Sequence, residues 1–282
     1  MTADGLFCLD VGAGPPLVVV HGGPEFDHSY LRPELDRLAG SLRVVYYDQR
    51  GRGRSAEGVR PGDVSLRSEI EDLDRVRSER GLESFAVLGH SWGGVLAMEY
   101  AVRHPERVSR LILMGTAPAS AGDWRLLREA FARNRPAADQ EALDALASSD
   151  AFARGDLEAE AAYYRIHFRM TLRRPDLLET LVARLLSNYS TDGVLLARAI
   201  MHRLSDETSR SADWNLFPEL RKLDVPTLLL HSEHDFIPVE LAERIAEAVP
   251  GARLSVLPGC GHFTFLEAPQ AVSEEVARFC GG

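Results

Sequence analysis

Hydrophobic residues occur along this chain in two patterns that predict two kinds of element. Short apolar runs, several of them rich in β-branched residues, predict buried strands of the kind found in parallel sheets. Segments whose apolar residues stand three or four positions apart predict amphipathic helices. The predicted strands cover residues 6–10, 17–20, 43–47, 85–88, 110–114, 226–231 and 253–257.

Strands and helices alternate as far as the strand at 110–114. The helices predicted in this part cover residues 31–38, 65–80 and 95–101. Ser65 is a suitable N-cap for the second of these helices, and Gly81 is a suitable stop. The alternation predicts an α/β fold built around a parallel sheet.

The alternation is interrupted in the middle of the chain. Only helices are predicted there, at residues 124–133, 139–146, 157–172, 177–186 and 194–204. The strand–helix rhythm then returns, with helices predicted at 239–249 and 269–279. We therefore expect one α/β core made of residues 1–116 and 215–282, with a helical insertion at residues 117–214.

The composition and net charge of the chain argue against nucleic acid and anionic membranes as binding partners. The 282 residues are 45% hydrophobic and 26% charged, as in ordinary globular proteins, and the net charge is −10. A chain this acidic is a poor ligand for nucleic acid or for an anionic membrane surface. The run Arg50–Arg54 superficially resembles an RNA-binding arginine–glycine segment, but a single short run in an acidic protein is better interpreted as a structural turn.

The sequence shows none of the usual patterns of a targeting signal. The segment Met1–Cys8 has neither the basic region nor the apolar run of a signal peptide, and no apolar run approaches the ~20 residues that span a bilayer. The three cysteines (Cys8, Cys260 and Cys280) are far apart and odd in number, which favours a reducing compartment. We expect a cytoplasmic protein.

A Gly-x-Ser-x-Gly pattern at Gly89–Gly93 is the first candidate for chemistry. It lies between the predicted strand 85–88 and the predicted helix 95–101. A sharp strand-to-helix turn with this pattern is typical of the nucleophile elbow, which exposes one serine hydroxyl above the edge of a sheet. Small flanking residues leave room for the strained serine backbone. Ser91 is therefore the candidate nucleophile.

A serine hydroxyl needs a general base, and His262 is the best candidate among nine histidines. It lies in a glycine-flanked loop after the strand 253–257, and such sheets place their sites at the carboxyl ends of strands. A solvated loop histidine is the competing interpretation. Other histidines lie in predicted helices and are interpreted as surface or packing residues: His104, His167 and His202.

The base in turn needs an orienting carboxylate, which in elbow folds stands between the serine and the histidine in the sequence. Two acids, Glu233 and Asp235, follow the strand 226–231. Asp235 is preferred for its position in the loop, although a helix-capping role ahead of Pro238 would also explain it.

Stabilisation of the oxyanion requires backbone N–H donors close to the nucleophile. Trp92, directly after the serine, offers one at the start of the helix. A second is expected from the loop His21–Pro24, where glycines let the backbone approach a substrate. Taken alone, that loop could equally be a tight turn.

Three stretches together resemble the α/β-hydrolase superfamily and, within it, the proline iminopeptidase family of serine aminopeptidases. They are His21–Pro24, Tyr47–Gly51 with Gly53 and Ser55, and Gly89–Gly94. The resemblance implies an α/β-hydrolase fold: a mostly parallel central sheet flanked by helices, with a helical cap inserted after the sixth strand. It also implies a triad of Ser91, Asp235 and His262, with Gly23 and Trp92 as oxyanion donors. The family's glycine after His-Gly-Gly-Pro is Glu25 here.

The resemblance implies that the helical cap at 117–214 holds the substrate. An aminopeptidase must bind an ammonium group, for which a carboxylate is the natural partner. The candidates are Glu25, Glu158, Glu160, Glu179 and Glu207, with Tyr163, Tyr164 and Phe168 as possible walls of an apolar pocket. For the cap glutamates a solvated helix face, and for the aromatic residues ordinary packing, are the competing interpretations.

No cofactor is expected. His231 and His234 flank Glu233, but no H-E-x-x-H helix or cysteine cluster accompanies them, and no phosphate-binding glycine motif is present. The leading prediction is a serine hydrolase that cleaves an amide or ester bond through an acyl-enzyme on Ser91. The resemblance implies that the favoured substrate is a peptide or amide with an N-terminal proline or a similar residue. An esterase, lactonase or C–C bond hydrolase remains an alternative, as does a non-catalytic ligand-binding protein of the same fold.

Overall fold

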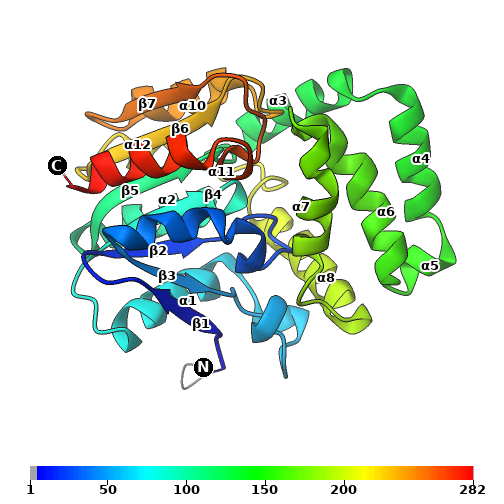
Figure 1. Cartoon of the computed structure of the whole chain (residues 1–282), viewed down its shortest axis with the longest axis horizontal. Coiled ribbons are helices and arrows are strands. Elements are labelled where there is room, and N and C mark those ends of the chain that lie inside the picture. The colour runs from blue at the N-terminus through cyan, green and yellow to red at the C-terminus, as the bar shows by residue number, and fades with distance from the viewer. Residues whose placement is uncertain (1–4, 282) are drawn as a thin grey trace.

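A seven-stranded sheet forms the centre of the molecule in the computed structural model, which describes residues 5–281 (Figure 1). The strands lie in the order β1-β3-β2-β4-β5-β6-β7, and only β1 runs antiparallel to its neighbour. This confirms the predicted mostly parallel sheet. The strands are β1 (Cys8–Val11), β2 (Pro16–Val20), β3 (Arg43–Tyr47), β4 (Phe85–His90), β5 (Val108–Met114), β6 (Thr227–Ser232) and β7 (Arg253–Leu257).

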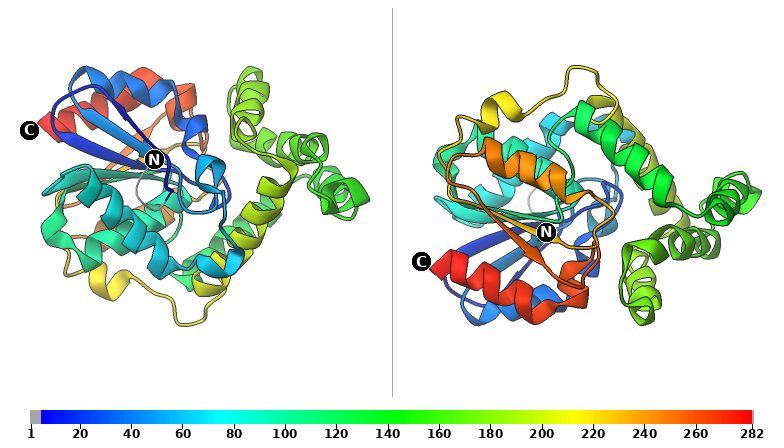
Figure 2. Two further views of the ribbon diagram at one scale, coloured as in Figure 1. Left: turned by 90° about the horizontal axis from the view of Figure 1, so that it is seen from below. Right: turned by 90° about the horizontal axis from the view of Figure 1, so that it is seen from above.

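Helices cover both faces of the sheet, as the two views in Figure 2 show. Alternate residues of each strand point to opposite faces, so Val18 and Val20 pack into one hydrophobic cluster while Leu17 and Val19 pack into another. The first cluster joins the sheet to α1 (Leu66–Glu79), α2 (Trp92–Arg103), α9 (Phe217–Leu220) and α10 (Val239–Ala248). The second joins it to α12 (Pro269–Gly281) and to two 3₁₀ helices, His28–Leu31 and Glu34–Gly40.

The expected start of α1 is confirmed, whereas the helix expected at residues 31–38 is not a single helix. The side chain of Ser65 accepts a hydrogen bond from the Ser68 N–H and caps α1, which confirms the expected start of that helix. The single helix expected at 31–38 is instead two 3₁₀ helices with Pro33 between them. Proline has no N–H to donate, which interrupts the helical hydrogen-bond pattern.

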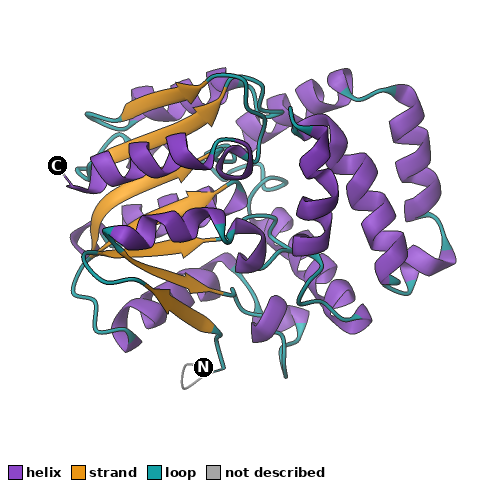
Figure 3. Cartoon of the chain, viewed as in Figure 1, coloured by secondary structure: helices purple, strands orange, loops and turns teal. Residues whose placement is uncertain are grey.

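The helices of residues 121–207, between β5 and β6, lie beyond the carboxyl ends of the parallel strands (Figures 1 and 3). There is one α-helix more than expected in this part of the chain, the short helix α5. The helices follow the fifth strand, β5, and not the sixth as the resemblance implied, because within residues 5–281 a single strand, β1, precedes β2. The helices are α3 (Ala121–Asn134), α4 (Ala137–Ala147), α5 (Asp150–Ala153), α6 (Leu157–Phe168), α7 (Leu178–Leu185) and α8 (Thr191–Glu207).

The arginine–glycine run after β3 has a structural role, as expected. The guanidinium of Arg52 is fully buried and pairs with Glu69 of α1 at 2.6 Å. Gly51 has φ +79°, and a Cβ there would lie 2.4 Å from Cδ1 of Ile200 in α8. The loop therefore needs glycine where it meets the inserted helices. In the part of the chain described, no helix is both long and apolar enough to cross a membrane.

Candidate active site

The turn between β4 and α2 has the geometry expected of a nucleophile elbow. Ser91 has φ 55° and ψ −119°, and it is the only non-glycine residue with positive φ among residues 5–281. A Cβ at Gly89 would lie 2.3 Å from the Gly93 carbonyl oxygen, and one at Gly93 would lie 2.2 Å from that of Val20. Both glycines are therefore required for the strained serine to sit at the sheet edge.

His262 pairs with Asp235 across the loops that follow β6 and β7. Nδ1 of His262 lies 2.9 and 3.0 Å from the two carboxylate oxygens, and both side chains are almost completely buried. Burial acts to raise the pKa of Asp235, but the charge of His262 and its hydrogen bond outweigh burial, and the pKa falls below its usual range. Glu233 instead accepts a hydrogen bond from the Gly259 N–H in an exposed setting, so the structure pairs His262 with Asp235 and not with Glu233.

A buried hydrogen-bond chain links the loops that carry these residues. The Gly22 N–H donates to Oη of Tyr30 at 2.8 Å, and that Oη lies 2.7 Å from Nδ1 of His90. Nε2 of His90 lies 3.3 Å from the carbonyl oxygen of His262. A consistent assignment has Tyr30 donating to Nδ1 and His90 donating from Nε2. Burial, and then the charge of His262, lower the pKa of His90 to about 3, so this ring stays neutral.

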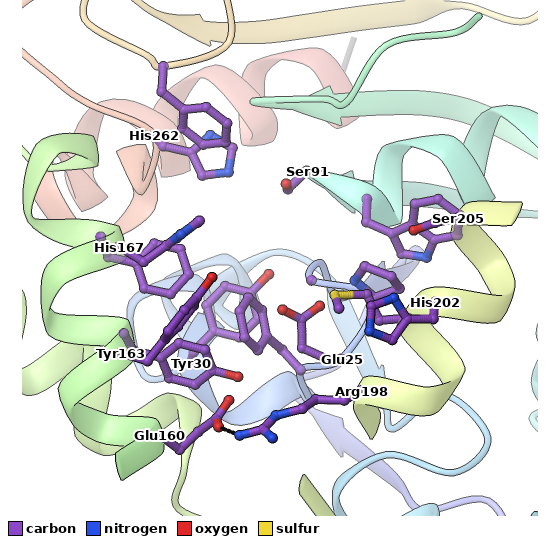
Figure 4. Close-up of a pocket in the computed structure, with 18 of the residues that line it drawn as sticks. Glu25, Tyr30, Ser91, Glu160, Tyr163, His167, Arg198, His202, Ser205 and His262 are labelled. Carbon is purple, nitrogen blue, oxygen red and sulfur yellow. Dashed lines mark hydrogen bonds and ion pairs between the residues drawn. The ribbon is translucent and has the colours of Figure 1, made fainter. Parts of the chain in front are cut away.

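Ser91 and His262 face a cavity of about 460 Å³ between the sheet and the inserted helices (Figure 4). Core loops supply one wall, and α6 and α8 supply the other. The lining is largely aromatic, with Phe26, Tyr30, Trp92, Trp124, Phe152, Tyr163, Tyr164, Phe168, Phe236 and Phe263. A cavity of this volume suits a small molecule or a short peptide.

The expected oxyanion donors lie at this cavity. Gly23 and Trp92 both line it, close to Ser91 in the chain or in space. Gly23 has φ +90°, and a Cβ there would lie 2.5 Å from the Phe26 ring, so only glycine fits. The N–H of the preceding residue, Gly22, is already bonded to Tyr30, so Gly23 is the better candidate donor of the two.

Glu25 extends from the same loop into the cavity, below Ser91 in Figure 4. Its backbone carbonyl accepts a hydrogen bond from the Tyr189 hydroxyl, which holds the loop. Burial, together with the nearby charge of Glu160, raises the pKa of the Glu25 carboxyl to about 7. No arginine, lysine or histidine side chain in the described part of the chain forms an ion pair with this carboxyl.

Glu160 also lines the cavity, but its charge is compensated. It pairs with Arg198, so that this ion pair joins α6 to α8 (Figure 4). The guanidinium of Arg198 also lies 3.5 Å from the centre of the Phe152 ring. The cavity therefore contains two carboxyl groups, Glu25 and Glu160, and one guanidinium.

The remaining candidates divide between the cavity and the surface. Tyr164 lines the cavity and packs edge-to-face on Phe26, with ring centres 5.7 Å apart. Glu158 is exposed at the start of α6 and is not part of the lining. Glu207 accepts a hydrogen bond from the Leu66 N–H at 2.8 Å, and Glu179 pairs with Arg165. Glu158, Glu179 and Glu207 thus occupy ordinary helix-surface or capping positions, and their assignment to the substrate site is corrected.

Two histidines that were interpreted as surface or packing residues line the cavity: His167 of α6 and His202 of α8. The available signal was the spacing of Tyr163, Tyr164, His167 and Phe168, which places them on neighbouring parts of one helix face. The hydrophobic pattern alone could not show that this face looks onto Ser91 and not onto the core.

Strand order, the elbow and the His262–Asp235 pair define the class of protein. The chain belongs to the α/β hydrolase fold family, whose model matches residues 15–269. A proline iminopeptidase of Saccharolobus solfataricus is 26% identical over 275 residues, which cover 95% of this chain and 85% of that protein.

Solved structures agree on the fold. The proline iminopeptidase of Mycobacterium smegmatis has a TM-score of 0.71 at 25% identity, with 98% of this chain and 94% of that chain covered. The 2-hydroxy-6-oxo-6-phenylhexa-2,4-dienoate hydrolase of Rhodococcus sp. strain RHA1 has a TM-score of 0.76 at 23% identity, with the same coverage. The second likeness concerns the fold alone. Together these relatives support a hydrolase.

Proposed function

We propose that this protein is a serine aminopeptidase similar to proline iminopeptidases, which releases an N-terminal proline or a similar residue from a short peptide or amide. The modest identity to named proline iminopeptidases supports the substrate class. The strained backbone of Ser91 and the His262–Asp235 pair support the reaction type.

In the proposed reaction Oγ of Ser91 attacks the substrate carbonyl, and Nε2 of His262 takes the hydroxyl proton. Asp235 holds Nδ1 and stabilises the imidazolium that forms. The N–H groups of Gly23 and Trp92 stabilise the oxyanion. His262 then gives the proton to the leaving amine, whose bond to the acyl carbon breaks. Water, deprotonated by the same histidine, releases the acyl group and restores Ser91. No step uses a cofactor.

One observation favours a substrate with a positive charge. The carboxyl of Glu25 faces an aromatic cavity, and the one guanidinium there, Arg198, already pairs with Glu160. An ionised Glu25 therefore leaves an uncompensated negative charge in a site of low polarity, which is costly until a cation enters. The secondary ammonium of an N-terminal proline would supply that charge next to the scissile carbonyl.

A small-molecule esterase, lactonase or C–C bond hydrolase is the second candidate. It would use the same triad, and the largely aromatic lining of the cavity favours an uncharged acyl group as much as a prolyl ring. The two candidates differ in what they require of Glu25.

The experiment combines an active-site probe with two substrates. A fluorophosphonate should label the wild type but not Ser91→Ala, and a folded wild type that resists labelling would favour a non-catalytic ligand-binding protein. Unlabelled enzyme from the same preparation is then assayed with prolyl 2-naphthylamide and with a short acyl ester. Turnover of the ester without turnover of the amide would reject the aminopeptidase in favour of the second candidate.

A further inference from the structure

His167 is held in one tautomer by a neighbour that cannot accept a hydrogen bond. Nη2 of Arg135, which follows α3, lies 3.2 Å from Nδ1 of His167. A guanidinium has only donors, so Nδ1 must be the acceptor and must lack a proton. The neutral ring therefore carries its hydrogen on Nε2.

The same neighbour keeps the ring neutral. Burial lowers the pKa of His167 to about 4, helped by the charge of Arg135 and then by that of His262. Stacking on Tyr163, with ring centres 5.8 Å apart and planes inclined by 16°, fixes the orientation of the ring. Near neutral pH His167 is thus a neutral donor of fixed geometry.

Nε2 of this donor is available to a ligand. His167 lines the cavity, and within residues 5–281 the one hydrogen bond of its ring is at Nδ1, which leaves Nε2 without a protein acceptor. Nε2 is also not among the fully buried polar atoms that lack a partner. Nε2 of His167 thus lacks a partner in the protein and is accessible from the cavity that the residue lines.

His167 lies on the His262 side of the cavity, away from Glu25. A series of aromatic contacts joins the two histidines: His262 to Phe236 at 4.5 Å, Phe236 to Phe131 at 4.9 Å, and Phe131 to His167 at 5.4 Å between ring centres. Figure 4 shows His167 and His262 on the same side of the view, with Glu25 between Ser91 and Arg198.

This placement decides which half of the substrate His167 meets. In acyl transfer the histidine that protonates the leaving group must lie beside it. Groups on the His262 side therefore contact the leaving group, while Glu25 and the oxyanion loop contact the acyl half. We propose that Nε2–H of His167 donates a hydrogen bond to the leaving group, and that the preferred leaving group carries a carbonyl oxygen, as the second residue of a peptide does. The acyl half of this substrate rests on the proposed function; the leaving-group site does not.

The test compares two substrates that share the prolyl group. L-Prolylglycinamide has a carbonyl in its leaving group, whereas prolyl 2-naphthylamide has none. One neutral hydrogen bond changes binding by up to about tenfold. The ratio of kcat/KM for the peptide amide to that for the arylamide should fall about tenfold in His167→Phe. It should largely recover in His167→Gln, whose amide N–H can replace Nε2–H.

Arg135 provides a second, indirect test as a positioning residue. Arg135→Met frees the His167 tautomer and should lower the same ratio two- to fivefold, an expectation on the scale of a weakened hydrogen bond. In the His167→Phe background the same substitution should leave the ratio unchanged. A general structural defect would lower kcat/KM for both substrates together and would leave the ratio where it was.

Equal losses on both substrates in His167→Phe would overturn the inference. If the wild type hydrolyses neither prolyl compound, the aminopeptidase proposal fails, and the inference is decided on O-acetylglycolamide and phenyl acetate. These esters also differ in a leaving-group carbonyl. The same selective loss in His167→Phe would support the leaving-group site, and its absence would reject it.

Discussion

Oη of Tyr30 lies 2.7 Å from Nδ1 of His90, the residue that directly precedes the candidate nucleophile. The same oxygen accepts the Gly22 N–H at 2.8 Å. One buried phenol therefore connects the loop of Gly23, the proposed oxyanion donor, to the turn that holds Ser91. Through Nε2, His90 extends this connection to the backbone of His262.

Removing that phenol should impair catalysis more than substrate binding. In Tyr30→Phe the Gly22 N–H and Nδ1 of His90 lose their partner in a buried site, at a cost of about 1–3 kcal/mol in unfolding free energy. The donor at Gly23 would shift, so we expect kcat to fall roughly tenfold or more with little change in KM. Steady-state kinetics and urea unfolding measure both.

Tyr47→Phe is a matched control, because the buried Tyr47 hydroxyl has no hydrogen-bond partner within the described structure. It should change neither quantity appreciably. Normal kcat in Tyr30→Phe would show that the hydrogen-bond chain does not position the catalytic loops.

Backbone strain at Ser91 should be visible as a stability difference. A non-glycine residue at positive φ costs roughly 1–3 kcal/mol, and glycine relieves most of this cost. We expect Ser91→Gly to raise the free energy of unfolding by about 1 kcal/mol while activity is lost. Ser91→Ala should lose activity without this gain, and equal stability of the two variants would contradict the strain argument.

Ionisation of Glu25 should control the binding of cationic ligands. Its pKa of about 7 means that the carboxyl of the free enzyme takes up a proton as the pH falls through neutrality. The Kd of Ser91→Ala for L-prolinamide, measured by calorimetry, should therefore rise as the pH falls from 8 to 6. The double variant Ser91→Ala/Glu25→Gln should bind weakly at both pH values. If the Kd of the double variant rose with falling pH as much as that of Ser91→Ala, a titrating group other than Glu25 would be responsible.

Glu25 should also make stability depend on pH. Its folded pKa of about 7 exceeds the reference value of 4.5, so the carboxyl begins to destabilise the fold above pH 4.5, and the cost is complete above pH 7. The shift corresponds to at most about 3 kcal/mol. Glu25→Gln should match the wild type at pH 4 and exceed its unfolding free energy at pH 8. Guanidinium unfolding at the two pH values measures the difference.

The buried pair of Arg52 and Glu69 tests the structural interpretation of the arginine–glycine run. Arg52→Met leaves the Glu69 carboxylate buried without its partner, which should cost about 3–5 kcal/mol. The double variant Arg52→Met/Glu69→Leu should recover most of that loss. Failure to recover would show that Arg52 contributes through its bonds to the Arg50 carbonyl and the Gln49 amide as well.

Elements with a local signal could be predicted from the sequence. The buried strands, the Ser65 cap and the Gly89–Gly93 turn each depend on neighbours in the chain, and the structure has them close to the expected positions. The pairing of His262 with Asp235 followed from the order of groups in an elbow fold. Asp235 was preferred to Glu233 for its position in the loop, and in the structure Asp235 lies at Nδ1 of His262 while Glu233 accepts the Gly259 N–H.

The identity of the cavity wall could not be predicted in the same way. Glu158 and Glu160 are two residues apart on α6, yet one is exposed and the other faces the cavity, because only the rotation of the helix separates them. The sequence predicted packing for His167, because its contact with Arg135, which follows α3, joins parts of the chain that are far apart in the sequence. Cytoplasmic location stays a prediction.

The missing side chain of Gly51 has a consequence for the evolution of substrate range. α8 approaches the core so closely there that a Cβ would meet Ile200, two residues from Arg198 and next to Met201 in the cavity wall. A larger residue at position 51 would have to displace the end of the Ile200 side chain and would strain the backbone of the loop. Substitution at a position that does not line the cavity would thus act on the helix that carries Arg198 and Met201, and through that helix on the size of ligand that the cavity admits.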